Sequence, residues 1–392
     1  MTATLHFPMS EYDRRIQKTR AEMTRRGFDL LVISDPSNMA WLTGYDGWSF
    51  YVHQAVLLGL DGEPVWWGRK MDANGALRTC FMAADNIVGY PDIYVQNPER
   101  HPMEHLAGLI AERRLTQGRV GVEMDNYWYT AAAHAALSPG IEGAKLGDAT
   151  GLVNWQRLVK SEQEVAFIRR AARIVERMHE LIFAMVEPGL PKNRLVAEIY
   201  KVAVEGAEGY FGDYPAIVPM LPSGIDATAP HLTWDDRPFE AGEGTFFEIA
   251  GCYRRYHCPL SRTVFLGEMP QKYGNAERAV LEATEAALAK ALPGNLAEEV
   301  AIAFFDELER HGFSKDSRTG YSIGLSYPPD WGERTVSLRR GDKTVLEKNM
   351  TLHFMPALWL DDGGLELSET ILITEKGAEC LADVPRRVVV KA

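Results

Sequence analysis

The sequence predicts a two-domain protein in which helices and strands are mixed in both domains. Its 392 residues exceed twice the length of a typical domain of about 150 residues. Helix and strand patterns alternate through the first part of the chain, which is typical of an α/β domain. In the second part, two helices and a group of strands occur twice in succession, although the letters themselves do not repeat. We place the domains at residues 1–156 and 157–392.

The elements of the first domain follow from apolar periodicity and turn residues. An amphipathic helix over 11–27 ends at a glycine, and the apolar run 28–34 follows as a buried strand. Two further apolar runs flank an Asp-Gly pair at 61–62, which is a strong signal for a hairpin. A helix over 103–114 and a strand over 119–123 continue the alternation.

The second domain begins with a long helix, because Ser161 and Glu164 have the spacing of a capping box. A second helix is expected over 191–208. Two strands around Thr245–Ala250 and Leu260–Phe265 follow, and we expect them to pair as a long hairpin. The remaining elements are helices over 271–290 and 295–311 and strands around 350–354 and 370–374.

Composition excludes several classes of function. The net charge is −12 and no block of basic residues interrupts the acidic balance, so neither nucleic acid nor an anionic membrane is expected as a partner. No apolar run approaches the ~20 residues of a spanning helix, and residues 1–20 lack a signal-peptide core. We therefore expect a soluble, cytoplasmic protein. The scattered cysteines Cys80, Cys252, Cys258 and Cys380 indicate neither a disulfide framework nor a zinc site.

Several short segments, in order along nearly the whole chain, resemble the creatinase/aminopeptidase P family (M24). The resemblance implies a creatinase-like N-terminal domain followed by a catalytic domain with the pita-bread fold, again mixing helices and strands. The segments are Asn38–Tyr45 (NMAWLTGY), Leu158–Glu164 (LVKSEQE), Gly320–Leu325 (GYSIGL) and Leu346–Met350 (LEKNM).

Metal-dependent members of this family hold two metal ions with two aspartates, one histidine and two glutamates. At the matching positions this sequence has Glu248, Pro259, Tyr321, Met355 and Ser368. Proline and methionine cannot replace carboxylates as ligands of a hard or borderline divalent ion. The resemblance therefore implies the metal-free branch, and we expect neither a metal nor another cofactor. A metallopeptidase with a degenerate site is the alternative.

Within that branch, segments 326–334 and 368–372 resemble the ectoine hydrolases, which open the cyclic amidine of ectoine to N-acetyl-2,4-diaminobutyrate. An amidinium carries its own positive charge, so a carboxylate and a histidine can hydrolyse it without a Lewis acid. We expect ectoine, and as a second candidate hydroxyectoine, as the small-molecule substrate. The alternatives are another amidine or amide hydrolase of the same branch and a non-enzymatic binding module. The resemblance also implies a homodimer, and a downstream deacetylase is a further candidate partner.

Four residues are candidates for catalysis. Glu248 stands in an otherwise apolar strand, where an unpaired carboxylate would be costly without a ligand. The alternatives are an edge-strand glutamate facing water and an ion pair with Arg262. His231 matches the position of the catalytic histidine that the resemblance implies, and it would act as a base or an acid. Tyr321 would donate a hydrogen bond or a proton unless it is a core tyrosine, and Glu369 begins the last strand beside a lost ligand position.

Eight further residues are candidates for binding the substrate. A proline-stiffened loop over 326–334 suits a pocket wall, and its Trp331 can pack against a planar amidinium, unless this is a surface loop whose Trp caps the core. His353 is equally well explained as a buried structural histidine. The aromatic loop 46–53 fits a lid that the partner subunit places over the site, or an ordinary dimer contact. The eight are Tyr327, Asp330, Trp331, Glu333, His353, Trp48, Phe50 and His53.

The substrate's carboxylate needs a cation. Nothing local chooses among four arginines, although one of them, Arg262, better fits a role in bracing the sheet. The four are Arg254, Arg255, Arg262 and Arg334.

Overall fold

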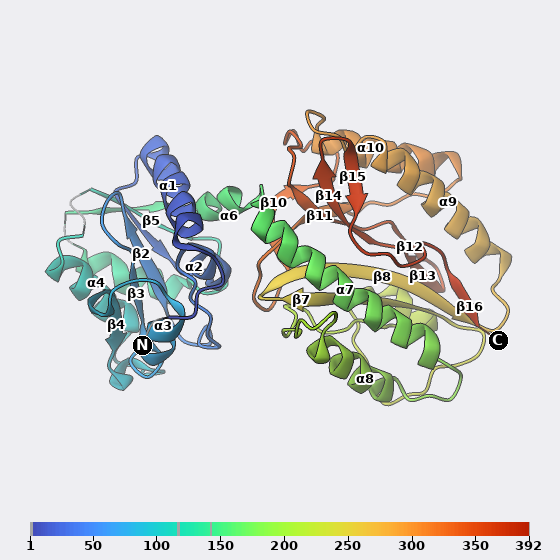
Figure 1. The fold of residues 1–392 in the computed structure, drawn as a ribbon, viewed down its shortest axis with the longest axis horizontal. Coiled ribbons are helices and arrows are strands. Elements are labelled where there is room, and N and C mark those ends of the chain that lie inside the picture. The colour runs from blue at the N-terminus through green and yellow to red at the C-terminus, as the bar shows by residue number, and fades with distance from the viewer. Residues whose placement is uncertain (1–2, 116–117, 142, 392) are drawn as a thin grey trace. The chain divides into compact units, whose positions relative to one another are not determined.

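A computed structural model describes residues 3–115, 118–141 and 143–391. The chain divides into two compact units, Met1–Arg157 and Leu158–Ala392 (Figure 1). Within the described part of the chain, no helix combines the length and the apolar character that crossing a membrane requires.

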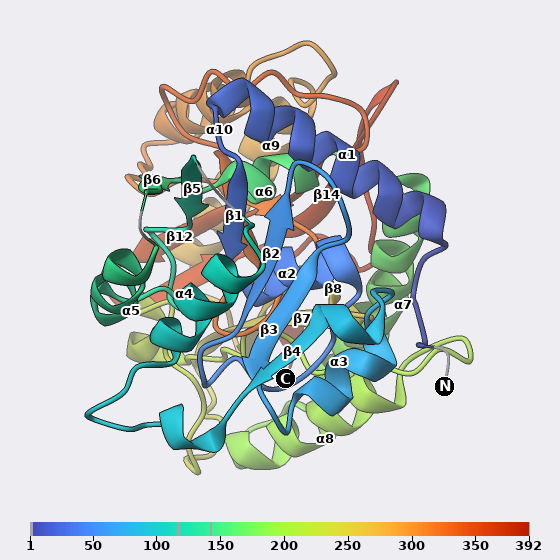
Figure 2. The ribbon, with the colours of Figure 1, turned by 90° about the vertical axis from the view of Figure 1, so that its left-hand side faces the viewer.

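The first unit is a six-stranded sheet with helices on both faces (Figure 2). The strand order is β4-β3-β2-β1-β5-β6, and only the pairs β1–β2 and β2–β3 are antiparallel. Alternate residues of β1 enter two different cores, because successive side chains of a strand point to opposite faces. Leu31 and Ile33 pack with α1, α2, α3 and α6, whereas Leu30 and Val32 pack with α4 and α5. The elements are α1 (Met9–Arg26), β1 (Leu30–Ile33), α2 (Pro36–Thr43), β2 (Ala55–Gly59), β3 (Val65–Arg69), α3 (Ala73–Thr79), β4 (Ile87–Tyr90), α4 (Pro102–Glu112), β5 (Arg119–Val122), α5 (Ala131–Leu137), β6 (Lys145–Asp148) and α6 (Leu152–Arg157).

Local sequence signals account for the ends of these elements. α1 stops at Gly27, whose φ of 71° lies in the left-handed region that glycine adopts without a steric penalty. The Asp-Gly pair at 61–62 lies in the turn between β2 and β3, which pair antiparallel with Ala55 opposite Trp67. The predicted hairpin is therefore confirmed.

The second unit repeats the order of two helices followed by strands. α7 (Glu162–Met185) and α8 (Lys192–Glu205) precede the long hairpin of β7 (Gly244–Tyr253) and β8 (Tyr256–Leu266), and α7 packs against both strands (Figure 1). α9 (Gln271–Leu288) and α10 (Ala297–Arg310) share a core with the sheet that follows them. That sheet has the order β10-β9-β11-β14-β15. The remaining strands are β9 (Gly320–Ile323), β10 (Gly332–Ser337), β11 (Thr351–Phe354), β12 (Ala357–Leu360), β13 (Gly363–Glu366), β14 (Glu369–Thr374), β15 (Gly377–Cys380) and β16 (Val389–Lys391).

The predicted capping box fixes the start of α7. The backbone N–H of Glu164 donates to the hydroxyl of Ser161 (3.3 Å), and the N–H of Ser161 donates to the carboxylate of Glu164 (2.8 Å). The other carboxylate oxygen accepts a hydrogen bond from the hydroxyl of Tyr256 (2.8 Å). The cap therefore also ties the helix to the turn of the β7–β8 hairpin.

Three groups of strands meet around Ser261 of β8. In the hairpin, Ser261 lies opposite Glu248 of β7. Its carbonyl accepts the N–H of Ser368, just before β14, and the neighbouring Thr263 exchanges hydrogen bonds with the backbone of Glu366 in β13. In the five-stranded sheet, His353 of β11 pairs with Tyr321 of β9. These registers bring polar residues of β7, β9, β11 and β13 to one place.

Candidate active site

Three buried polar side chains converge where these strands meet. Glu248 comes from β7, His353 from β11 and Glu366 from β13, and one nitrogen or oxygen atom of each lies within 4.8 Å of the others. Glu248 is 6%, Glu366 2% and His353 0% exposed, so the group is almost completely withdrawn from water. We call these three residues the acid–imidazole cluster.

The backbone around Glu248 explains why its side chain is fixed. β7 has β8 on one side, and on its open side the N–H of Glu248 donates to the carbonyl of Met220 (2.9 Å). This bridge and the burial of the residue exclude a glutamate facing water. Arg262, the other alternative, lies opposite Phe247 in the hairpin, one position along, and binds Glu369 instead. Glu248 therefore belongs to the cluster.

Burial makes both carboxylic acids of the cluster hard to ionise. It raises the pKa of Glu248 well above the ordinary value, and the nearby charge of Glu366 raises that pKa further. Burial also raises the pKa of Glu366, to about 7. Because one negative charge opposes the other, the two groups titrate as a pair and favour holding one proton between them near neutral pH.

Lys315 supplies the cluster with a positive charge. The residue lies in the loop of residues 311–319 between α10 and β9, and its ammonium Nζ is 5.6 Å from the ring centroid of Trp359. Its charge lowers the pKa of both Glu248 and Glu366. Burial lowers the pKa of Lys315 itself, and the two carboxylates oppose that change. The charges of Glu248, Glu366 and Lys315 are therefore coupled.

A chain of hydrogen bonds runs through His353. The indole N–H of Trp331 donates to the hydroxyl of Tyr321 (2.8 Å), and that hydroxyl lies 3.2 Å from Nδ1 of His353. The Nε2 atom of His353 lies 2.9 Å from the hydroxyl of Ser368. Because Tyr321 already accepts from Trp331, its own proton is directed to Nδ1, which leaves Nε2–H to donate to Ser368. The network thus assigns His353 a neutral tautomer.

The pKa directions agree with that assignment. Burial, and then the positive charge of Arg318, lowers the pKa of His353 to about 3. Burial and the charge of Glu248 raise the pKa of Tyr321 well above 10, so the phenol keeps its proton. Arg318 was not among the residues predicted from the sequence, and its guanidinium carbon lies 4.2 Å from the ring centroid of Tyr321. The site therefore offers a phenol donor and a neutral imidazole.

The predicted pocket loop lies partly at this site. Trp331 is fully buried and its ring is edge-on to that of His353, with centroids 6.1 Å apart. The charge of Asp330 contributes to the raised pKa of both Glu248 and Tyr321. Tyr327 is buried, and the guanidinium of Arg255 lies 5.6 Å from its ring centroid. The carboxylate of Glu333 forms a buried ion pair with Lys160 (2.6 Å), and its predicted contact with the substrate stays a prediction.

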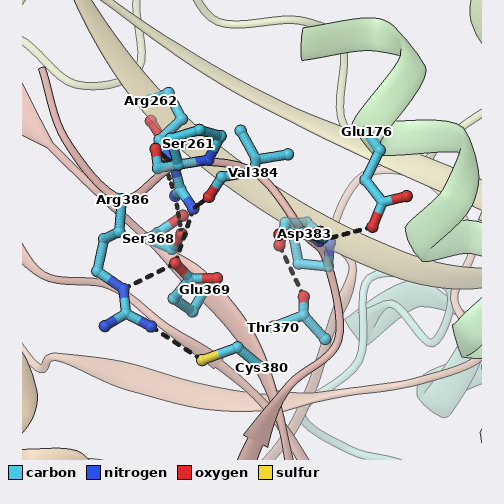
Figure 3. Close-up of polar contacts among 12 residues, drawn as sticks. Glu176, Ser261, Arg262, Ser368, Glu369, Thr370, Cys380, Asp383, Val384 and Arg386 are labelled. Carbon is cyan, nitrogen blue, oxygen red and sulfur yellow. Dashed lines mark hydrogen bonds and ion pairs between the residues drawn. The ribbon is translucent and has the colours of Figure 1, made fainter. Parts of the chain in front are cut away.

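Glu369 lies in a different polar network (Figure 3). Its carboxylate binds Arg262 (2.7 Å) and Arg386 (2.9 Å), and Arg262 also donates to the carbonyl of Ser368 (2.6 Å). Successive side chains in extended chain point to opposite faces, so Ser368 reaches His353 while Glu369 reaches the arginines. These contacts pair Glu369 with two arginines, and Arg262 thereby braces β8 against the start of β14. The catalytic role of Glu369 stays a prediction.

Of the remaining predicted residues, one lies in the second unit and three lie in the first. His231 is exposed, in a turn just after a short 3-10 helix (Gly224–Thr228) that packs against β7 and β13. Trp48, Phe50 and His53 belong to the first unit, where the rings of Trp48 and Phe50 lie 4.7 Å apart. His53 there lines a cavity of about 180 Å³.

The residues present do not fit the two-metal site of the metal-dependent relatives. Pro259 lies opposite Ala250 in the hairpin and offers no ligand atom at the second aspartate position. The acid–imidazole cluster has three donors, but both ring nitrogens of His353 are engaged by Tyr321 and Ser368. Lys315 adds a positive charge to the same group, which opposes the entry of a divalent cation.

Glu366 and Lys315 are the two residues at the centre of this site that the sequence did not reveal. Glu366 could have been suspected, because it is a single carboxylate in the apolar run Leu365–Leu367, as Glu248 is in its own strand. Lys315 lies in a loop without apolar periodicity, and its neighbours Asp316 and Ser317 are exposed. Only the fold places it beside the cluster.

Comparisons with known proteins agree with this architecture. Residues 166–375 match the model of metallopeptidase family M24, and residues 15–159 match the creatinase/prolidase N-terminal domain. A protein of Halomonas elongata named ectoine hydrolase is 59% identical over 395 residues, covering 99% of both chains. Among solved structures, a prolidase from Thermococcus sibiricus superposes with a TM-score of 0.83 at 19% identity, covering 97% of this chain and 99% of that one. A dipeptidase from Pyrococcus horikoshii gives a TM-score of 0.80 at 19% identity, covering 96% and 99%. The chain therefore belongs to the M24 family, with a creatinase-type N-terminal domain and a pita-bread catalytic domain, as its sequence motifs predict.

Proposed function

We propose that this protein is an ectoine hydrolase, which opens the cyclic amidine of ectoine to N-acetyl-2,4-diaminobutyrate without a metal ion. The buried pair Glu248 and Glu366, which shares a single lysine, is the observation that carries this proposal. A bound amidinium favours the ionised form of both acids, and with Lys315 charged the three groups then sum to one negative charge. An amidinium brings the single positive charge that balances it. The similarity to the Halomonas elongata enzyme supports the same substrate.

The reaction adds one water across a carbon–nitrogen bond of the amidinium. The water oxygen bonds to the ring carbon that carries the methyl group, the bond from this carbon to one ring nitrogen breaks, and that nitrogen takes up a proton as it leaves. Glu248 supplies the carboxylate, by direct attack or by removing a proton from water, and in both routes it must be ionised when the substrate binds. Glu366, with a pKa of about 7, can accept and return a proton near neutral pH.

The hydrogen-bonded chain through His353 gives the site its fixed polar wall. Tyr321 is held protonated and points its hydroxyl at a neutral His353, so neither group competes with Glu248 for the cation. Trp331 holds the hydroxyl of Tyr321 from the other side. The role of these fixed side chains is to orient the planar substrate.

A metal-free reaction follows from the donor set and from the substrate. The amidinium already carries the charge that a Lewis acid would otherwise provide. His231, in the turn after the short 3-10 helix, remains the proposed histidine acid or base. Its replacement by alanine should reduce kcat by about 10²-fold, which is the size of general acid–base catalysis. Unchanged kcat would remove it from the mechanism.

We further propose that two copies of the chain pair and that the loop 46–53 of one copy closes the site of the other. Trp48 and Tyr51 are 58% and 60% exposed, which is unusual for aromatic side chains and fits a contact surface. Trp48→Ala should then raise KM for ectoine and shift the protein towards monomer in light scattering. A monomeric wild-type protein with full activity would contradict this arrangement.

The test of the proposed function is proton NMR of the purified protein with ectoine in excess EDTA. We expect the amidine methyl resonance of ectoine to be replaced by an acetyl methyl resonance. Glu248→Gln should reduce the rate by about 10²–10⁴-fold, whereas the control Glu375→Gln, at an exposed ion pair with Lys348, should leave it unchanged. Turnover that appears only after a divalent metal is added would overturn the metal-free proposal. No turnover under either condition would overturn ectoine as the substrate.

A further inference from the structure

The position of Lys315 is set by the aromatic side chains next to the cluster. Its ammonium lies 5.6 Å from the ring centroid of Trp359, and that ring lies 5.4 Å from the ring of Phe246. Phe246 and Glu248 are two residues apart in β7 and share one face of the strand. Trp359 lies opposite Gly364 in β13, two residues before Glu366. The ammonium therefore lies beside Trp359, whose ring contacts Phe246 of β7 and whose strand pairs with β13.

The acid–imidazole cluster is also a place where a cation would be stabilised. Two carboxylates and an imidazole within 4.8 Å of one another have the composition of a divalent-metal site. Such a cluster is costly to bury without a positive charge, because each carboxylate has lost its hydration. In this chain the positive charge near both acids is an ammonium attached to the protein.

We infer that Lys315 occupies the electrostatic role that metal ions have in the metal-dependent relatives, and that its ammonium keeps divalent cations out of the Glu248–His353–Glu366 cluster. This role of Lys315 rests on the proposed metal-free function, because it explains how the site works without a metal ion. Its test is made without substrate, so its failure and that of the proposed function are separate results.

The neutral variant Lys315→Met should convert the cluster into a metal site. Removal of the ammonium leaves two acids and an imidazole with no compensating charge, and a divalent ion then supplies it. His353 can offer a nitrogen by releasing its hydrogen bond with Ser368. We expect Lys315→Met to bind Co²⁺ at one equivalent, at least ~10-fold more tightly than the wild type.

Titration with Co²⁺, followed by the visible absorption of the bound ion and by calorimetry, measures this binding. Lys315→Arg keeps the charge and should bind as weakly as the wild type. Lys343→Met removes an exposed lysine that pairs with Glu298 and should also leave binding unchanged. In the Lys315→Met background, Glu366→Gln should abolish the gain, because it removes one of the three ligands.

Three results would overturn the inference. One is a wild-type protein that binds Co²⁺ at one equivalent as tightly as Lys315→Met. Another is a folded Lys315→Met protein, judged by its melting curve, that gains no binding. The third is a gain that persists after Glu366→Gln, because the ion would then lie outside the cluster. Lys315→Gln, which keeps a polar side chain in the loop, replaces Lys315→Met if the latter does not fold.

Discussion

Replacing Glu366 with glutamine should make the catalytic unit more stable at alkaline pH while impairing the enzyme. The folded protein raises the pKa of this carboxyl from 4.5 to about 7, chiefly because the group is buried. The folded state therefore binds the proton more tightly than the unfolded state, and stability is lost as the pH rises from about 4.5 to about 7. Glutamine fills the same space and cannot ionise, so the variant does not lose this stability.

The size of the effect follows from the two pKa values. A rise from 4.5 to about 7, at 1.36 kcal/mol per pH unit, corresponds to about 3 kcal/mol at pH 8. The second unit spans 235 residues (392 − 158 + 1), and for domains of that size 1 kcal/mol shifts Tm by about 2–4 °C. We therefore expect Glu366→Gln to raise the Tm of this unit by roughly 6–12 °C at about pH 8 and by little at about pH 5.

Differential scanning calorimetry at the two pH values measures this difference, with Glu375→Gln as the control because that carboxylate is exposed and paired with Lys348. A Tm gain of equal size at both pH values would mean that the charge of Glu366 is not its source. A lower Tm of Glu366→Gln than of the wild type at alkaline pH would mean that Lys315 and Ser261 stabilise the ionised carboxylate by more than burial destabilises it. Either result would refute the reasoning.

Three further outcomes follow from the same contacts. Burial raises the pKa of both Glu248 and Glu366, and the charge of Glu366 raises that of Glu248 further, so kcat/KM should increase with pH through the neutral range. Glu366→Gln should move the acidic limb of the remaining activity to lower pH. Arg262→Met breaks a buried ion pair and should lower the free energy of unfolding by about 3–5 kcal/mol. The kcat per folded molecule should stay the same, and a large fall in kcat would show that this network takes part in the reaction. Trp331→Phe removes the donor to the Tyr321 hydroxyl and should lower kcat/KM by about 10-fold, whereas an unchanged value would show that the chain of hydrogen bonds is not needed.

The fold could be predicted from the sequence largely because its signals are local. The Asp-Gly turn at 61–62, the capping box of Ser161 and Glu164 and the apolar strands of the β7–β8 hairpin each act within a few residues. The structure places all three as predicted. Helix ends differ from prediction by up to three residues, as in α8, where the predicted 191–208 is observed as Lys192–Glu205.

A residue of the candidate site could be predicted only where it lies in the same strand as a recognisable sequence motif. Glu248 and Tyr321 lie in strands that the motifs marked, and both reach the cluster or its hydrogen-bonded chain. Lys315 and Arg318 come from a loop whose path depends on how α10 packs, so no spacing in the sequence indicates them. The motif also does not tell which of two adjacent residues points towards the cluster, and in the structure Ser368 reaches His353 while Glu369 binds Arg262.

The alternation of side chains along these strands separates two polar networks with opposite energetic roles. Ser261 and Ser368 face the acid–imidazole cluster, whereas their neighbours Arg262 and Glu369 face each other. In the first network two like charges share one lysine, so removing a charge should relieve the fold and damage the reaction. In the second network opposite charges are matched, so removing one should damage the fold and spare the reaction. Replacements of Glu366 and Glu369, only three residues apart, should therefore change Tm and kcat in opposite ways, because the first carries an unfavourable buried charge and the second a well-paired one.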